Sequence, residues 1–341
     1  MVSKINQILK KIGLASIFGI IVSIFVIVYI IYNINFSLVG LAFKKLDTGW
    51  IFLMIIIYLF GFILRGVRWH LMLLPIKYIR YKSTIEGVVV GHMANSVLPA
   101  RAGELVRAIF IGNIEKISKA SALGTVFIER VFDGLVIVGI LIISLLVLKF
   151  DVANRELINS IAVMGSLIFF SAIVVLFIGA KYRKLLEKPL IFVINYLPGK
   201  MSDNGERVAS NFLDSLNVLK ALNKLPYIIT CSICIWLAEG SIFWIAFIAF
   251  HLPGNLLMAY FTLAFVNLGM IIPSAPGGIG LFQGANILAF SFFAISMESA
   301  LSYSIVIHSI MIIPTVLIGL FIIYRHGIIL LKTRLFRSEE N

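Results

Sequence analysis

Six charged side chains lie in or beside segments of the sequence that are otherwise almost entirely apolar. Three are arginines and three are carboxylates: Arg101, Glu104, Arg107, Glu129, Arg130 and Asp133. A guanidinium meets a phosphate in a bidentate fork, so the arginines suit an anionic headgroup. The carboxylates would then neutralise the empty site or carry a coupling proton. The alternative is that the six charges pair with one another and only lock helices together.

Placing these charges in a membrane constrains their surroundings. On insertion scales, each would cost roughly 2.5–3.5 kcal/mol at the centre of a lipid-exposed helix, so six would cost about 15–20 kcal/mol. They must therefore face each other or a hydrated cavity. Glu129 and Asp133 are one helical turn apart and share a face, with Arg130 three residues before Asp133.

A glycine-rich turn is the second candidate site. It contains Gly277, Gly278 and Gly280, with Gln283 and Asn286 as the nearby polar side chains. Such a turn allows close backbone approach, and a helix that starts after it would direct N–H groups toward an anion. A tight turn without a ligand is the alternative.

Other polar side chains have two readings each. Arg65, Arg68 and Trp69 stand at the end of an apolar run, where they indicate either the cytoplasmic side of a span or a headgroup interface. The isolated groups Glu239, His92 and His308 would be proton relays or, more simply, hydrogen-bonded interior groups. Cys231 and Cys234 lie inside an apolar run, which favours core packing over a redox or metal site. We expect neither a metal nor a cofactor.

Composition sets the class of protein. The chain has 341 residues, of which 60% are hydrophobic and 13% charged, with a mean hydropathy of +1.05. A soluble protein of this length would carry far more charge, so the sequence predicts an all-α polytopic membrane protein. The net charge of +13 is spread over short links between apolar runs. That distribution indicates topology signals and anionic lipid headgroups rather than nucleic acid.

Hydropathy predicts about six full spans. They cover residues 14–34, 50–64, 120–148, 157–178, 227–250 and 303–324. The first run is too long for the apolar part of a signal peptide and has no cleavage site after it, so we expect it to stay in the membrane. The polar region 180–225 carries Val208, Phe212, Leu216 and Leu219 at helical spacing, which predicts an amphipathic helix on the membrane surface.

Two further apolar segments are broken in the middle. Residues 84–114 are interrupted at Pro99 and Gly103, and residues 256–297 at Pro273 and Pro276. Each arm is too short to cross a bilayer, so each segment is predicted to enter and leave from one face. Both breaks share the pattern P-x-x-x-G-x-[LI]. Two matched breaks of opposite sidedness indicate an inverted-repeat transporter with its site near the midplane.

The basic links fix a predicted orientation. With both termini in the cytoplasm, the basic segments 65–82, 180–225 and the C-terminal tail lie inside, and the poorly charged links 35–49, 149–156 and 251–255 lie outside. The first broken segment then opens to the cytoplasm and the second to the outer face. We expect a multi-pass protein of the cell membrane.

Four motifs carry a family resemblance. They are Gly66–Trp69, Leu98–Arg107, Glu129–Asp133 and Pro276–Gly280, in that order. With them the chain resembles the flippase-like membrane region of lysylphosphatidylglycerol synthases, which also occurs as stand-alone membrane proteins. The resemblance implies that the region moves a lipid between leaflets. It also implies that the six charges and the three glycines named above occupy the family's characteristic positions.

The resemblance has two departures. Many members have a carboxylate where this chain has Gln283, so proton coupling through that position is in doubt. Larger members also carry a cytosolic aminoacyl-transferase domain, which we expect this chain to lack because it stops at Asn341, just after the last span.

Three functions remain open at this point. The first is a translocator of an anionic or aminoacylated phospholipid, or of a polyprenyl-phosphate lipid. The second is a membrane partner of a separately encoded transferase, which a neighbouring transferase gene would favour. The third is an enzyme, either a phosphatidylglycerol lysyltransferase or a membrane glycosyltransferase. It is the least favoured because no loop is long enough to fold a nucleotide or tRNA site.

Overall fold

The computed structural model describes residues 2–98, 102–195, 205–221 and 223–339, and within these ranges the fold is all-α. The first half contains α1 (Val2–Asn33), α2 (Phe36–Lys44), α3 (Gly49–Leu73), α4 (Tyr81–Val97), α5 (Gly103–Glu115), α6 (Lys119–Val147) and α7 (Val152–Lys181). The second half contains α8 (Arg183–Asn195), α9 (Gly205–Asp214), α10 (Asn217–Lys220), α11 (Leu225–Ala249), α12 (Leu256–Gly269), the 3-10 turn η3 (Pro276–Gly278), α13 (Leu281–Ser291) and α14 (Met297–Glu339).

Five of the described helices are long and apolar enough to cross a membrane: α3, α6, most of α7, α11 and residues 297–327 of α14. A sixth span is reached if α1 and α2 are taken together, although the chain bends by 89° between them. Many side chains on these helices are apolar and exposed, as lipid contact requires. The chain is a multi-pass membrane protein.

Local capping residues decide where several helices start. The side chains of Asn35, Ser118, Asp151 and Asn255 accept hydrogen bonds from backbone N–H groups in the first turns of α2, α6, α7 and α12. Each of these polar residues follows the end of an apolar run, so it both closes one segment and starts the next.

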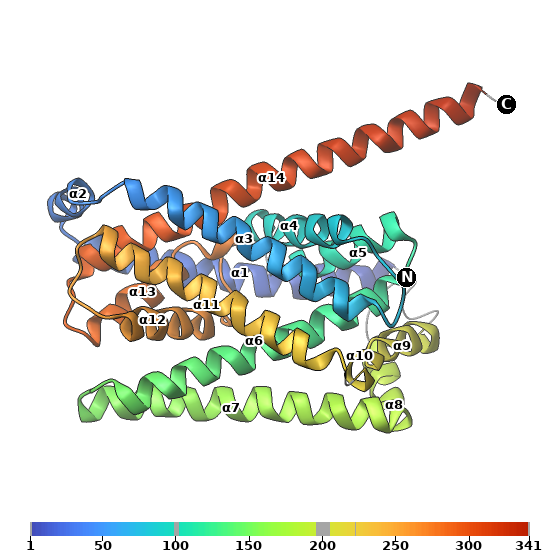
Figure 1. Cartoon of the computed structure of the whole chain (residues 1–341), viewed down its shortest axis with the longest axis horizontal. Coiled ribbons are helices and arrows are strands. Elements are labelled where there is room, and N and C mark those ends of the chain that lie inside the picture. The colour runs from blue at the N-terminus through green and yellow to red at the C-terminus, as the bar shows by residue number, and fades with distance from the viewer. Residues whose placement is uncertain (1, 99–101, 196–204, 222, 340–341) are drawn as a thin grey trace.

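The two broken segments form short helical pairs. In the first, α4 packs on α5, and in the second α12 packs on α13 across η3. Figure 1 shows α4 and α5 toward the end of the bundle where α8, α9 and α10 lie, and α12 and α13 toward the opposite end, near α2. We call these pairs the first hairpin (residues 81–115) and the second hairpin (residues 256–291). Pro99 and Arg101, at the first break, lie outside the described residues.

Two segments differ from the sequence prediction. The predicted span 50–64 continues to Leu73, because arginines in its second half are neutralised by carboxylates on other helices and so need not end the helix. In the polar region 180–225, Leu216 and Leu219 are buried, and α9 packs against α6. The apolar side of α9 and α10 therefore packs against the protein, whereas α8 keeps exposed apolar side chains.

Candidate functional site

A buried network of charges joins three helices. Arg107 on α5 donates two hydrogen bonds to Glu129 on α6, at 2.8 and 3.0 Å. Arg68 on α3 donates two to Asp133 on α6, at 2.5 and 3.1 Å, and also lies 3.1 Å from Glu129. Four of the six predicted charges, Arg107, Glu129, Arg130 and Asp133, therefore come together, and Arg68 joins them from α3, 65 residues before Asp133 in sequence.

Neighbouring side chains complete this network. The indole of Trp69 donates to Thr125 at 3.0 Å, and the Arg107 guanidinium lies 3.7 Å from the centre of the Trp69 ring. The indole of Trp236 donates to Asp133 at 3.0 Å. These contacts hold the carboxylates in fixed orientations, so the charges of the network are not free to move.

The predicted interface residues are placed in the interior. Arg68 and Trp69 are both fully buried (0% exposed), and Arg65 is buried in an ion pair with Glu239 on α11. These three side chains lie inside the bundle because the fold brings them their partners on α6 and α11. A role at a headgroup interface stays a prediction.

Arg130 differs from the other arginines in the network. Its Nη2 lies 2.7 Å from Glu129 and 3.1 Å from Asp133, yet 39% of its side chain is exposed. Both of these contacts use Nη2, so Nη1 has no protein partner among the described residues. Arg130 is thus held in position from one side while the other side of its guanidinium stays accessible.

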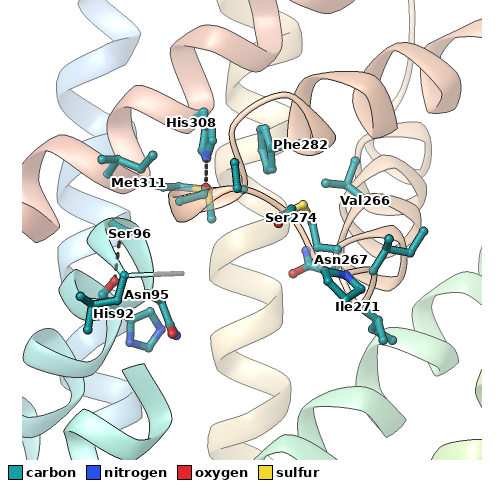
Figure 2. Close-up of a pocket in the computed structure, with 18 of the residues that line it drawn as sticks. His92, Asn95, Ser96, Val266, Asn267, Ile271, Ser274, Phe282, His308 and Met311 are labelled. Atoms are coloured by element: carbon teal, nitrogen blue, oxygen red, sulfur yellow. Dashed lines mark hydrogen bonds between the residues drawn. The ribbon is translucent and has the colours of Figure 1, made fainter. Parts of the chain in front are cut away.

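The accessible side of Arg130 faces a cavity of about 460 Å³. The cavity is bounded by the end of α4, by the turn of the second hairpin and by α14, which contributes His308 and Met311 (Figure 2). Glu104 lines it as well, and its Oε2 is buried without a hydrogen-bond partner in the described part of the chain. This volume suits a polar headgroup.

The tips of the two hairpins meet beside this cavity. Gly277 adopts φ +68°, and a Cβ there would lie 3.0 Å from the carbonyl oxygen of Ser96 at the end of α4. Only glycine combines this positive φ with so close an approach. In the first hairpin, the Gly103 N–H donates to Asn95 Oδ1 at 2.7 Å, which ties the start of α5 to α4.

A directional chain of hydrogen bonds holds the glycine-rich turn. Gly280 N–H donates to Gln283 Oε1 at 2.8 Å, and Gln283 Nε2 lies 3.0 Å from His308 Nδ1. His308 Nε2 lies 2.8 Å from the carbonyl oxygen of Gly277. Because a carbonyl only accepts, Nε2 carries the proton and Nδ1 accepts from Gln283. The imidazole is therefore neutral in this arrangement.

The remaining predicted residues fall around the cavity or just behind it. Gly278 and Pro273 line the cavity, and Pro276 opens η3. Gly280 packs against Ser23 of α1. Arg101 and Pro99 are not described. Sequence reasoning missed Tyr58, Asn95, Ser96 and Asn267 as lining residues; only Asn95 and Ser96 carried a signal, because they stand directly before the break at Pro99.

Comparison with known proteins places the chain in a family. The model of the lysylphosphatidylglycerol synthase transmembrane region matches residues 16–319. The chain belongs to this family. The match covers both hairpins, the charge network and the cavity, so the site described above lies within the family's own region. No solved structure matches the chain.

Curated relatives include two UPF0104 membrane proteins and one longer protein. A UPF0104 membrane protein of Methanocaldococcus jannaschii is 29% identical over 232 residues, which cover 67% of this chain and 92% of that protein. A UPF0104 membrane protein of Methanothermobacter thermautotrophicus is 24% identical, with 78% of this chain and 82% of that protein covered. Glycosyltransferase AglD of Haloferax volcanii is 24% identical over 75% of this chain but only 45% of its own length.

Proposed function

We propose that the protein moves a lipid with a phosphate-bearing headgroup between the two leaflets of the cell membrane. The observation that carries this proposal is the position of the cavity between the tips of two opposed hairpins, with the accessible side of Arg130 in its wall. A guanidinium with one free edge suits a phosphate oxygen. Opposed discontinuous helices that meet at a polar site are a feature of transporters with alternating access.

The network behind Arg130 supports this role. Arg68 and Arg107 each bind carboxylates through both terminal nitrogens and are buried, so the headgroup site rests on Arg130 rather than on several accessible arginines. The ion-pairing alternative accounts for the two buried arginines. It leaves the 39% exposure of Arg130 to a cavity without a role.

The orientation belongs to the same proposal. The basic link after α3, the region 180–225 and the C-terminal tail lie in the cytoplasm with both termini, following the positive-inside rule. The first hairpin opens to the cytoplasm and the second to the outer face. The cavity then lies between two entrances, one for each leaflet.

Leaflet exchange in proteoliposomes tests the proposal. Liposomes with purified protein would receive a panel of acyl-labelled lipids, and the rate of exchange would be compared with that of protein-free liposomes. The test variant is Arg130→Gln, which keeps a hydrogen-bonding side chain but removes the charge. The matched control is Arg183→Gln, because Arg183 is also 39% exposed and also pairs with an aspartate, Asp214, far from the cavity.

We expect at least one phosphate lipid to exchange faster than in protein-free liposomes. Arg130→Gln should slow it at least about tenfold, and Arg183→Gln should leave it unchanged. Folded protein that accelerates no lipid would refute the translocator. It would favour a second candidate, a membrane partner of a lipid enzyme. The observation behind this second candidate is that the matched region forms 45% of a longer relative named a glycosyltransferase.

A further inference from the structure

Hydrogen bonds inside the protein use up donors that face the cavity. His92 Nδ1 lies 2.9 Å from the carbonyl oxygen of Val88, and a carbonyl only accepts, so Nδ1 carries the proton. His92 Nε2 is then an acceptor. The Ser96 hydroxyl donates to the carbonyl of His92 at 3.1 Å, so Ser96 Oγ is left as an acceptor.

Hydrogen bonds within the protein also occupy donors on the other side of the cavity. The Thr315 hydroxyl donates to the carbonyl of Met311 at 2.6 Å. Tyr58 must therefore donate its proton to Thr315 Oγ1 at 3.0 Å, and its own oxygen is left as an acceptor. Asn267 Nδ2 donates to the carbonyl of Leu263 at 2.9 Å, which leaves Oδ1 as an acceptor and the second N–H as a donor.

Glu104 adds a further acceptor to this set. A carboxylate only accepts hydrogen bonds. The Oε2 atom of Glu104 is buried without a partner among the described residues. On the donor side, Arg130 offers Nη1, and Asn95 offers its amide N–H groups because its oxygen accepts from Gly103. Among the described residues, the lining therefore presents one cation, a few neutral N–H donors and several acceptors, rather than a basic pocket.

Local charge agrees with this polarity. Three arginines, Arg68, Arg107 and Arg130, face three carboxylates, Glu104, Glu129 and Asp133, so the charges of these six residues sum to zero. A balanced site has no general attraction for anions. A bare phosphate would satisfy Arg130 but would leave the acceptors without a partner from the ligand, and a site built to hydrogen-bond its substrate rejects analogues that lack those groups.

We propose that the headgroup of the transported lipid carries several O–H or N–H donors beside its phosphate. The phosphate lies against Arg130, and the donors face Glu104, His92 and Asn267. This inference rests on the proposed function and sharpens its substrate class. Hydroxyl groups and a primary ammonium share the required chemistry, and the experiment distinguishes them.

Two matched pairs of acyl-labelled lipids test it by leaflet exchange in proteoliposomes. Phosphatidylethanolamine and phosphatidylcholine share their phosphate and formal charges, but only the first has N–H donors. Phosphatidylglycerol and phosphatidylethanol share their net charge, but only the first has free hydroxyls. We expect the donor-bearing member of at least one pair to exchange at least about tenfold faster than its partner. A response in the first pair would indicate that the site recognises an ammonium group, and a response in the second pair that it recognises hydroxyl groups.

Equal rates within both pairs, above the rate in protein-free liposomes, would overturn this inference but leave the translocator intact. Acceleration of no lipid would overturn both. The two failures are therefore distinguishable in one experiment.

Variants of the acceptors give a second readout. Asn267→Leu and Glu104→Gln each remove acceptor capacity, and Glu104→Gln keeps the shape of the side chain. We expect the ratio of rates within the responsive pair to fall toward one in both variants. The control Ser160→Ala removes a hydroxyl on the exposed side of α7 and should leave the ratio unchanged. The ratio is calculated within one protein preparation from the rates above those of protein-free liposomes, so partial misfolding of a variant does not alter it. An unchanged ratio in both variants would contradict the proposal.

Discussion

Glu129 lies within ion-pairing distance of three arginines at once. Arg107 binds it through two hydrogen bonds, Arg130 through one at 2.7 Å, and Arg68 lies 3.1 Å away. The carboxylate is fully buried, so its negative charge is compensated only by these neighbours. Among the described residues, Glu129 is the only carboxylate paired with the buried Arg107, whereas Arg68 also pairs with Asp133. At the scale of single residues, Glu129 is therefore a structural centre, and Arg130 is the member that reaches the cavity.

Replacing this centre should be costly. We expect Glu129→Gln to lower the free energy of unfolding by about 3–5 kcal/mol, because it leaves buried guanidinium groups without a compensating charge. Equilibrium unfolding in detergent would measure the change. Glu156→Gln, on the exposed side of α7, is the control and should be close to neutral. Equal stability of the two variants would contradict the structural role of Glu129.

The isolated pair of Arg65 and Glu239 allows a cleaner test of buried charge. Each side chain is only 6–7% exposed, and the two partners are 174 residues apart. We expect Arg65→Met and Glu239→Leu each to destabilise by about 3–5 kcal/mol, and the double variant to recover most of that loss. A double-mutant cycle by detergent unfolding measures the coupling. Additive losses would show that the two charges do not depend on each other.

At the scale of elements, the first hairpin depends on close contact between α4 and α5. A Cβ on Gly103 would lie 2.0 Å from the carbonyl oxygen of Gly91 and 2.4 Å from Asn95 Oδ1. The Gly91 carbonyl belongs to the backbone of α4, and Asn95 Oδ1 accepts the hydrogen bond from the Gly103 N–H. Neither atom can move away without separating α4 from α5. The hairpin thus depends on glycine at one position.

We therefore expect Gly103→Ala to destabilise the protein by about 1–3 kcal/mol through overpacking. A matched substitution, Gly139→Ala on α6, meets nothing within 4 Å and should be neutral or slightly stabilising, because alanine favours helix. Thermal unfolding of the two variants in the same detergent gives the comparison. Similar melting temperatures would mean that the hairpin arms are not tightly packed.

The second hairpin is held by the chain from Gly280 through Gln283 to His308. Gln283→Glu would place a carboxylate oxygen, which only accepts, against the accepting Nδ1 of His308. The contact is repaired only when a proton is added to one of the two groups. We expect the variant to lose about 1–3 kcal/mol of stability at high pH and to regain it on acidification.

Detergent unfolding across a pH series measures this effect. Gln283→Met removes the hydrogen bonds without adding an acceptor, so its loss should not depend on pH. A pH-independent loss in both variants would show that the orientation of the amide is not what matters.

Sequence patterns predicted most of these elements but not their partners. Long apolar runs locate the spans, and prolines and glycines locate the two breaks, because both signals are local. The extension of α3 past Arg65 was missed, because it depends on Glu239 and Asp133, which only the fold brings near. For the same reason, the sequence grouped Arg107 with Glu129 and Asp133 but could not tell which arginine stays accessible.

At the scale of the whole molecule, the two hairpins lie toward opposite ends of the bundle (Figure 1). Their tips meet at Ser96 and Gly277, beside the cavity. α1 covers the turn of the second hairpin, where the Ser23 hydroxyl accepts from the Ala275 N–H at 2.9 Å. Many side chains in residues 17–33 of α1 are exposed, so the turn is shielded on this side by one lightly packed helical segment.

This arrangement makes a prediction about sidedness. If each hairpin enters and leaves from one face, the links flanking it must lie on the same side. Single cysteines at Tyr78 and Lys119 would flank the first hairpin, and cysteines at Asn255 and Ser296 the second; all four positions are exposed. The native Cys231 and Cys234 would first be replaced by alanine.

With a membrane-impermeant maleimide on intact cells, we expect labelling at 255 and 296 only. Positions 78 and 119 should label only after the membrane is opened, because the positive-inside rule predicts that the basic link after α3 lies in the cytoplasm. Labelling of 78 and 119 from opposite faces would mean that the first hairpin crosses the bilayer as a continuous span. The cavity would then no longer lie between two opposed entrances, and the route proposed for the lipid would have to be abandoned.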